Sequence, residues 1–274
     1  MDQMLLSNEI SIRLGFFFGV FILVGAWELI APRRPLAVAK LGRWAANLGL
    51  VVLNSLLLRL LFPAAAVGFS AICAQEGWGL LNNISLSPWL GVAVAVVVLD
   101  FVIYLQHVLF HALPILWRLH RVHHADLDYD VTTGARFHPV EIILSMVVKI
   151  AAISVLGAPP VGVLIFEVVL NATAMFNHGN IYIPVKIDRI IRLCIVTPDM
   201  HRVHHCVEVD LTNSNFGFSL SIWDRTMGTY AEKPAEWHRE MKIGLDHFRD
   251  PKQVNALPGI LLLPFKKHLG RYPL

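Results

Sequence analysis

Apolar residues fall into five long runs separated by short polar segments. The runs cover residues 12–32, 45–73, 88–105, 142–156 and 160–176. A helix of about 20 apolar residues crosses about 30 Å of hydrocarbon, so the first three runs predict membrane-spanning helices. Arg59 and Pro63 interrupt the second run, and residues 157–160 predict a tight turn between the last two. The last two runs are shorter, and they either span the membrane or form a hairpin that only dips into it.

The composition agrees with a bilayer as the solvent of this chain. Hydrophobic residues make up 55% of the 274 positions and charged residues 16%, and the mean hydropathy is +0.58. A soluble domain of this size uses fewer apolar residues. The net charge of +3 is modest and the basic residues are scattered, which argues against a nucleic-acid surface. The three cysteines have no paired spacing, so no disulfide framework is predicted.

The loop charges predict the orientation of the bundle. The first run follows Asp2 and Glu9 and lacks a small-residue cleavage site, so we expect a retained anchor rather than a signal peptide. Four basic residues lie within residues 33–43, whereas residues 74–87 contain no Lys or Arg. The first loop is therefore expected to be cytoplasmic. Counting crossings from there puts every histidine cluster on the cytoplasmic side.

Ten of the 13 histidines lie between residues 107 and 205, mostly at spacings that bring side chains together. The pattern H-x-x-H-H occurs twice, at residues 120–124 and 201–205, and each places three imidazoles on one helical face. His107 and His111 have helical i, i+4 spacing at the end of the third apolar run. One zinc ion usually takes four ligands, so this number of histidines predicts two metal ions. For His238, His247 and His268 an ordinary core or surface role is expected.

Several single residues near the boxes are further candidates. His138 precedes Pro139 and Glu141, so the two titratable residues either contribute to the metal site or only cap a helix. His178 ends the fifth apolar run, and we expect it to be a ligand. Asp100 lies on the same helical face as His107, where it either orients a histidine or serves only helix packing.

The remaining charged residues near the boxes have simpler expected roles. The acidic residues after the boxes could bind metal, but they are rather expected to be solvated or to accept hydrogen bonds from ligating histidines, and they are Asp126, Asp128, Asp130, Glu208 and Asp210. Arg121 and Arg202 are expected to point away from the metals and to pair with those acids. A snorkelling role is expected for Lys149 within the fourth apolar run.

The number of imidazoles and their setting favour iron as the metal. Imidazole ligands suit zinc, copper, nickel or iron, and the ligand type alone does not choose among them. A site beside apolar helices faces alkyl chains or sterols, whose C–H bonds resist acid–base chemistry. Zinc has no redox chemistry, whereas iron with O2 can attack such bonds.

The histidine pattern resembles the three boxes of the sterol desaturase and fatty acid hydroxylase superfamily, the integral-membrane diiron oxygenases. The resemblance covers residues 99–230 and includes His138-Pro139-x-Glu141, Asn177-His178-x-Asn180, Thr197-Pro198, Asn215-Phe216-Gly217 and the segment 223–229. It implies nine iron ligands, with His138 and Glu141 as motif members in an open role, ligand or outer partner. The implied ligands are His107, His111, His120, His123, His124, His178, His201, His204 and His205. Fatty acid 2-hydroxylase-type members have a histidine where this chain has Ala174, which favours a sterol desaturase-like or alkylglycerol monooxygenase-like branch.

The resemblance also implies a reaction and its partners. Two Fe ions, as Fe2+ or Fe3+, with O2 as co-substrate would hydroxylate or desaturate a sterol, fatty acyl or alkylglycerol lipid. No G-x-G-x-x-G fingerprint and no cysteine cluster occurs, so a separate reductase, cytochrome, ferredoxin or pterin must supply electrons. The competing hypotheses are a zinc-dependent hydrolase, disfavoured because H-E-x-x-H is absent, and a metal transporter, disfavoured because the apolar runs contain few polar residues.

The predicted fold class is therefore all-α, an integral-membrane helical bundle with a cytoplasmic helical cap that carries a dimetal site. Three regions are expected: membrane helices over residues 1–87, a catalytic domain over 88–230, and a cytoplasmic or interfacial segment over 231–274. Residues 256–265 within the last region are apolar but too short to span a bilayer. A bacterial inner membrane is the expected location, or the endoplasmic reticulum in a eukaryote.

Overall fold

The computed structural model describes residues 2–268, which are helical apart from loops and three isolated β-bridges. The helices are α1 (Asp2–Ser7), α2 (Glu9–Ile30), α3 (Lys40–Leu61), α4 (Ala65–Gln75), η1 (Leu80–Asn82), α5 (Pro88–Ala112), α6 (Pro114–His124), η2 (Thr133–Ala135), α7 (Pro139–Leu156), α8 (Pro160–Asn177), α9 (Val185–Ile191), α10 (Pro198–His204), α11 (Val209–Thr212), α12 (Ile222–Thr226), α13 (Trp237–Glu240), α14 (Pro251–Val254), α15 (Leu257–Leu262) and η3 (Leu263–Phe265). The predicted all-α class is confirmed for the described residues.

Five helical segments are long and apolar enough to cross a membrane. They cover residues 9–30, 40–83, 88–112, 139–156 and 160–177. The interruption expected in the second run is present, since α3 ends at Leu61 and α4 begins at Ala65. The 18 residues of α7 and of α8 each span about 27 Å, close to the thickness of the hydrocarbon layer.

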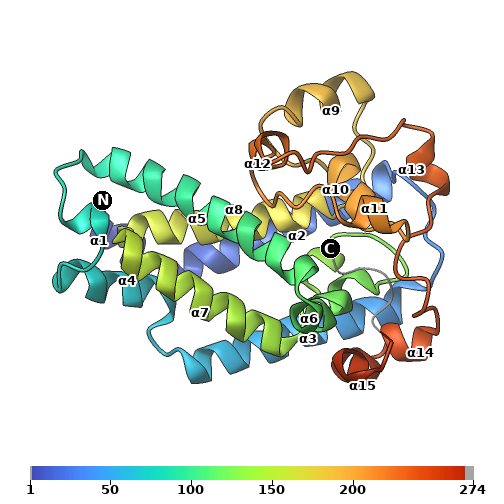
Figure 1. The fold of residues 1–274 in the computed structure, drawn as a ribbon, viewed down its shortest axis with the longest axis horizontal. Helices are drawn as coiled ribbons and strands as arrows, with labels where there is room; N and C mark the ends of the chain where they lie inside the picture. Colours follow the sequence, from blue (N-terminus) through green and yellow to red (C-terminus); the bar gives the residue numbers. More distant parts are fainter. Residues whose placement is uncertain (1, 269–274) are drawn as a thin grey trace.

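The long helices pack around a central pair, α5 and α8 (Figure 1). Helix α2 packs against α8, and α3 packs against α7, which itself contacts α5. The apolar core of this bundle includes Leu99, Ile103, Met146, Ile153 and Phe166, all buried. Burial of such side chains between helices, together with contact of the outer faces with lipid, accounts for the high apolar content of the chain.

The turn between α7 and α8 depends on two glycines. Gly157 ends α7 with a left-handed backbone, φ +68°, a conformation that glycine adopts without strain. The loop between α4 and η1 passes so close that a Cβ on Gly79 would lie 2.1 Å from the backbone nitrogen of Gly157. The predicted tight turn is confirmed, and the preceding loop packs directly on it.

Proline sets the start of each helix that carries or flanks the histidines. Helices α5, α6, α7, α8 and α10 all begin with a proline, whose missing N–H would have no intrahelical partner there. Pro114 also ends α5, because proline cannot continue a helix interior. The chain therefore bends after His111, and α6 folds back against the end of α5.

The shorter helices from α9 onward gather at one end of the bundle, where α5 and α8 end and α7 begins, whereas α1 and α4 lie at the other end (Figure 1). The prediction that all histidine clusters lie at one end is confirmed. The late apolar stretch forms α15 and η3 and packs there against α3 and α6, with Ile260 and Leu263 buried beside Leu50 and Trp117. This stretch holds the short helices at the histidine end against the bundle, and it is not a sixth membrane-spanning helix.

Candidate metal centre

Nine of the predicted histidines converge into two groups at the end of the bundle. Within each group, one ligand atom from every residue lies within 4.8 Å of the ligand atoms of the others. The larger group contains His107, His111, His120, His124 and His204, and the smaller contains His123, His178, His201 and His205. All nine side chains are buried. Each H-x-x-H-H box contributes to both groups, so the two groups are interleaved.

One ring nitrogen of most of these histidines is fixed by an oxygen acceptor. The Nδ1 atoms of seven rings lie 2.6–3.3 Å from such an oxygen. Since a carbonyl or carboxylate oxygen can only accept, each of these Nδ1 atoms donates, and the Nε2 lone pair remains free. The partners are the carbonyls of Phe216, Arg136, Ala174, Asn215 and Ser214 and the side chains of Asn213 and Glu141.

The Nε2 atoms either have no partner or face another histidine. Those of His107, His120, His201 and His204 are buried without any hydrogen-bond partner in the described residues. The Nε2 atoms of His178 and His123 lie 3.1 Å apart although both rings already donate through Nδ1. Two facing lone pairs repel one another unless a cation lies between them. This arrangement fits a metal ion in each group.

Burial keeps the rings neutral, as metal ligands must be. It lowers the pKa of each buried histidine outside the spanning helices, because the imidazolium form loses its hydration. The pKa of His178 falls to about 3, and those of His120, His123, His124, His201, His204 and His205 also fall well below the usual 6.5.

A loop at residues 213–217 supplies acceptors for four of the rings. Its conformation is held by Asp224, whose carboxylate accepts from the backbone N–H groups of Phe216 and Gly217. Asn215 adopts φ +52° and ties the loop to α10 by donating to the carbonyl of Met200. Sequence analysis included Asn215, Phe216 and Asp224 only as part of a resemblance and gave them no role.

His138 lies outside both groups. It is the residue before α7, where its Nδ1 accepts from the N–H of Val140 at 3.2 Å and its Nε2 lies 3.3 Å from the carbonyl of Leu261. Both ring nitrogens of His138 therefore have partners within the protein. Of the two expected roles, the structure places His138 as a helix cap, while Glu141 contacts His120.

The expected roles of the acids after the first box are wrong. Asp126 and Asp130 are buried and pair with Arg43, and Asp128 accepts from the backbone of Ala37 and Val38. Because these partners lie in α3 or just before it, the acids fasten this part of the chain to the loop after α6. Sequence analysis could not pair residues that are more than 80 positions apart.

Three other charged residues also serve the framework. Asp100 accepts from the backbone N–H of Leu220 and from the Trp223 indole, so the helix-packing role is the one observed. Arg121 donates to backbone carbonyls near residues 263–268 and not to the expected acids. Arg202 pairs with Asp199 on its own helix.

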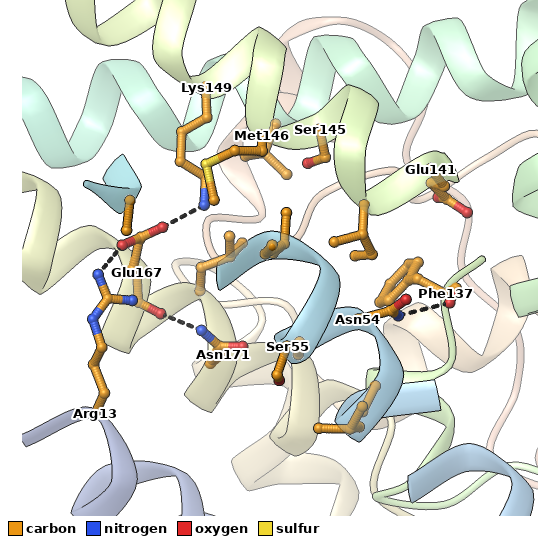
Figure 2. Close-up of a pocket in the computed structure, with 18 of the residues that line it drawn as sticks. Arg13, Asn54, Ser55, Phe137, Glu141, Ser145, Met146, Lys149, Glu167 and Asn171 are labelled. Atoms are coloured by element: carbon orange, nitrogen blue, oxygen red, sulfur yellow. Dashed lines mark hydrogen bonds and ion pairs between the residues drawn. The ribbon is translucent and has the colours of Figure 1, made fainter. Parts of the chain in front are cut away.

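A cavity of about 570 Å³ reaches one side of the centre from within the bundle. It is lined at this end by His107, His120, Glu141 and Ala174, and it extends between α2, α3, α7 and α8 (Figure 2). Gly134 also lines it, and a Cβ there would lie 2.4 Å from the carbonyl oxygen of Ala174. Sequence analysis missed Gly134, since nothing local marks this close approach.

Comparison with known proteins agrees with the arrangement of the site. The fatty acid hydroxylase family model matches residues 92–229, which contain every histidine of both groups. The chain is 28% identical to an ornithine lipid hydroxylase of Rhizobium tropici over 62% of this chain and 53% of that protein. It is 26% identical to the alkylglycerol monooxygenase of Homo sapiens over 65% of this chain and 38% of that protein. The chain thus spans about half the length, or less, of these relatives, and no solved structure matches it.

Proposed function

Since this chain belongs to the fatty acid hydroxylase family, we propose that it is a membrane-bound oxygenase that hydroxylates a lipid at a diiron centre. The observation that carries this proposal is the pair of buried histidine groups, in which the Nε2 atoms either lack any partner in the described residues or face one another. The relatives are named as a lipid hydroxylase and a monooxygenase, which favours hydroxylation over desaturation.

The proposed iron ligands are the nine histidines of the two groups. Two bound irons would supply the O2 chemistry that cleavage of an unactivated C–H bond requires. The protein's part is to hold neutral imidazoles in place through their Nδ1 partners and to bring the lipid to the His107 and His120 side of the centre. The buried setting excludes bulk water from this side.

The proposed orientation places the centre on the cytoplasmic side, where a separate electron donor can reach it. The segment between α2 and α3, at the end of the histidines, carries Arg33 and Arg34 and is followed by Lys40 at the start of α3, whereas residues 76–87 at the other end contain no Lys or Arg. This charge bias supports a cytoplasmic centre by the positive-inside rule. A bacterial inner membrane remains our proposed location, with a reductase, cytochrome, ferredoxin or pterin as donor.

Metal analysis with Mössbauer spectroscopy on iron-57-labelled, detergent-purified protein tests the proposal. About two irons per chain as a coupled pair, with O2- and reductant-dependent oxidation of a lipid extract, is the expected result. Zinc can displace iron during overexpression, so zinc-containing protein would be reconstituted anaerobically with iron. Protein that still binds no paired iron would rule out the proposal.

A further inference from the structure

The far end of the cavity is charged, although it lies among helices that cross the membrane. Glu167 of α8 pairs with both Arg13 of α2 and Lys149 of α7. The side chain of Glu167 is only 6% exposed and that of Lys149 only 12%. Figure 2 shows the two cations reaching Glu167 from different helices, away from Glu141 at the metal end. The snorkelling role expected for Lys149 is wrong, because its ammonium group is paired inside the bundle.

This charged cluster, defined here as Arg13, Lys149 and Glu167, retains donors for a ligand. Both carboxylate oxygens of Glu167 are occupied, one by each cation. An ammonium group has three N–H donors, and Lys149 uses one of them on Glu167 within the described residues. The other charged residues that line this end are Glu9, which pairs with Arg13, and Arg59. Arg59 is exposed and forms no ion pair with the cluster in the described residues, so the donors available to a ligand at this end are the N–H groups of Lys149 and Arg13 that Glu167 and Glu9 leave free.

The cavity wall between the two ends is also polar. Asn54 donates through Nδ2 to the carbonyl of Phe137, so its other amide atom, Oδ1, is an acceptor, and it is buried without a partner in the described part of the chain. Gln106 donates to Ser145, and its Oε1 is likewise unpartnered. A buried acceptor without a donor costs free energy, so these two amide oxygens favour a ligand that carries a hydroxyl or N–H donor between its acidic group and its hydrocarbon chain.

Residue spacing along α7 and α8 gives the separation of the two ends of the cavity. Glu167 and Ala174 are seven residues apart on α8, and Lys149 and Glu141 are eight apart on α7. At 1.5 Å per residue the charged cluster is about 10 Å from the metal end along one helix and about 12 Å along the other. Two independent helices thus give the same separation.

Resting on the proposed function, we propose that this cavity binds the polar end of an acidic lipid, with its carboxylate or phosphate at Arg13 and Lys149. The carbon beside the metal centre then lies about 10–12 Å from the acidic group, the separation of the two cavity ends along α8 and α7. The acidic group, rather than the end of the hydrocarbon chain, determines which carbon is oxidised.

Direct binding to iron-loaded protein tests the proposal without turnover. The probes are tritiated hexadecyl phosphate, palmitate and hexadecanol, which share one chain length, together with inorganic phosphate. At least one acidic amphiphile should bind the wild type about 10-fold or more tightly than hexadecanol, the difference expected for one charge-assisted hydrogen bond. Lys149→Gln should abolish this preference, and Lys149→Arg should retain most of it.

The outcomes separate this proposal from the proposed function. Equal binding of acidic and neutral probes, or an unchanged preference in both Lys149→Gln and Arg13→Gln, would overturn the acidic-lipid proposal while leaving a diiron oxygenase intact. Inorganic phosphate that binds as tightly as hexadecyl phosphate would overturn it too, since the site would then serve a free anion. If the wild-type protein bound no iron pair, the proposed function itself would be ruled out. Iron content in each variant confirms that the centre has folded.

Discussion

The two histidine groups lie side by side but have different surroundings. In the group of five, His107 and His120 line the cavity, whereas no histidine of the group of four is among its described lining residues. The group of five also uses side-chain acceptors, Glu141 and Asn213. The Nδ1 acceptors found for the group of four are backbone carbonyls.

We infer that substrate reaches the centre from the side of the group of five, which lines the cavity, and that the fold encloses the group of four. A carboxylate partner makes an imidazole a better ligand and can be changed by substitution. A backbone carbonyl can be moved only by moving the helix or loop that carries it. We therefore expect the group of five to respond to side-chain changes and the group of four to respond to changes in packing.

The largest effect is expected from removing one ligand in either group. His204→Ala in the group of five and His201→Ala in the group of four should each reduce iron from about two to about one per chain. Both should lower lipid oxidation beyond the roughly 100-fold that loss of an outer partner can cost. Iron analysis and product formation by mass spectrometry measure the two effects. Full activity in either variant would refute the assignment of both groups to one centre.

A smaller effect is expected from Glu141→Ala, which removes the acceptor of His120 Nδ1 while leaving the ligand. Activity or iron affinity should fall by roughly 10- to 100-fold. Ser145→Ala is the matched control, because Ser145 lies one turn further along α7 and lines the same cavity without a hydrogen bond to a histidine in the described residues. Equal loss in both variants would mean that the cavity wall, not the carboxylate, is responsible.

The group of four should instead be sensitive to Gly134→Ala. The new Cβ would lie 2.4 Å from the carbonyl oxygen of Ala174, the acceptor of His178 Nδ1, so the last turn of α8 must shift. We expect one of the two irons to be lost to a chelator faster, by about the 10-fold typical of an impaired outer partner. Gly91→Ala is the control, because nothing lies within 4 Å of its added Cβ. A chelation rate like that of the control would show that the α8 turn tolerates the methyl group.

Sequence predicted which histidines converge because their spacing is local, and their role as iron ligands stays a prediction. The box at residues 120–124 lies on α6, the box at residues 201–205 lies on α10 and its C-cap residue, and the spacing of His107 and His111 is helical. The apolar runs likewise predicted the spans, since the hydrophobic pattern reports contact with lipid or with the bundle core. The three-part domain division remains a prediction.

The features that sequence could not predict are pairings between distant segments. Arg43 is buried against Asp126 and Asp130, and Lys149 against Glu167, so residues expected at a wet surface are inside. Gly134 matters because α8 passes over it, which no local pattern indicates. For His138 the local pattern allowed both a ligand and a cap, and only the position of α15 brings the carbonyl of Leu261 to its second nitrogen.

The smallest effect is therefore expected at His138, the one candidate ligand that belongs to neither group. His138→Ala should retain both irons and cost about 1 kcal/mol of stability, the usual price of a lost N-cap. His138→Asn should recover most of that loss, because an asparagine side chain also caps helices well. Thermal unfolding in detergent and iron content measure the two quantities. If His138→Ala and His138→Asn both lost an iron, His138 would be needed for metal binding, and it would have to be assigned to one of the two groups.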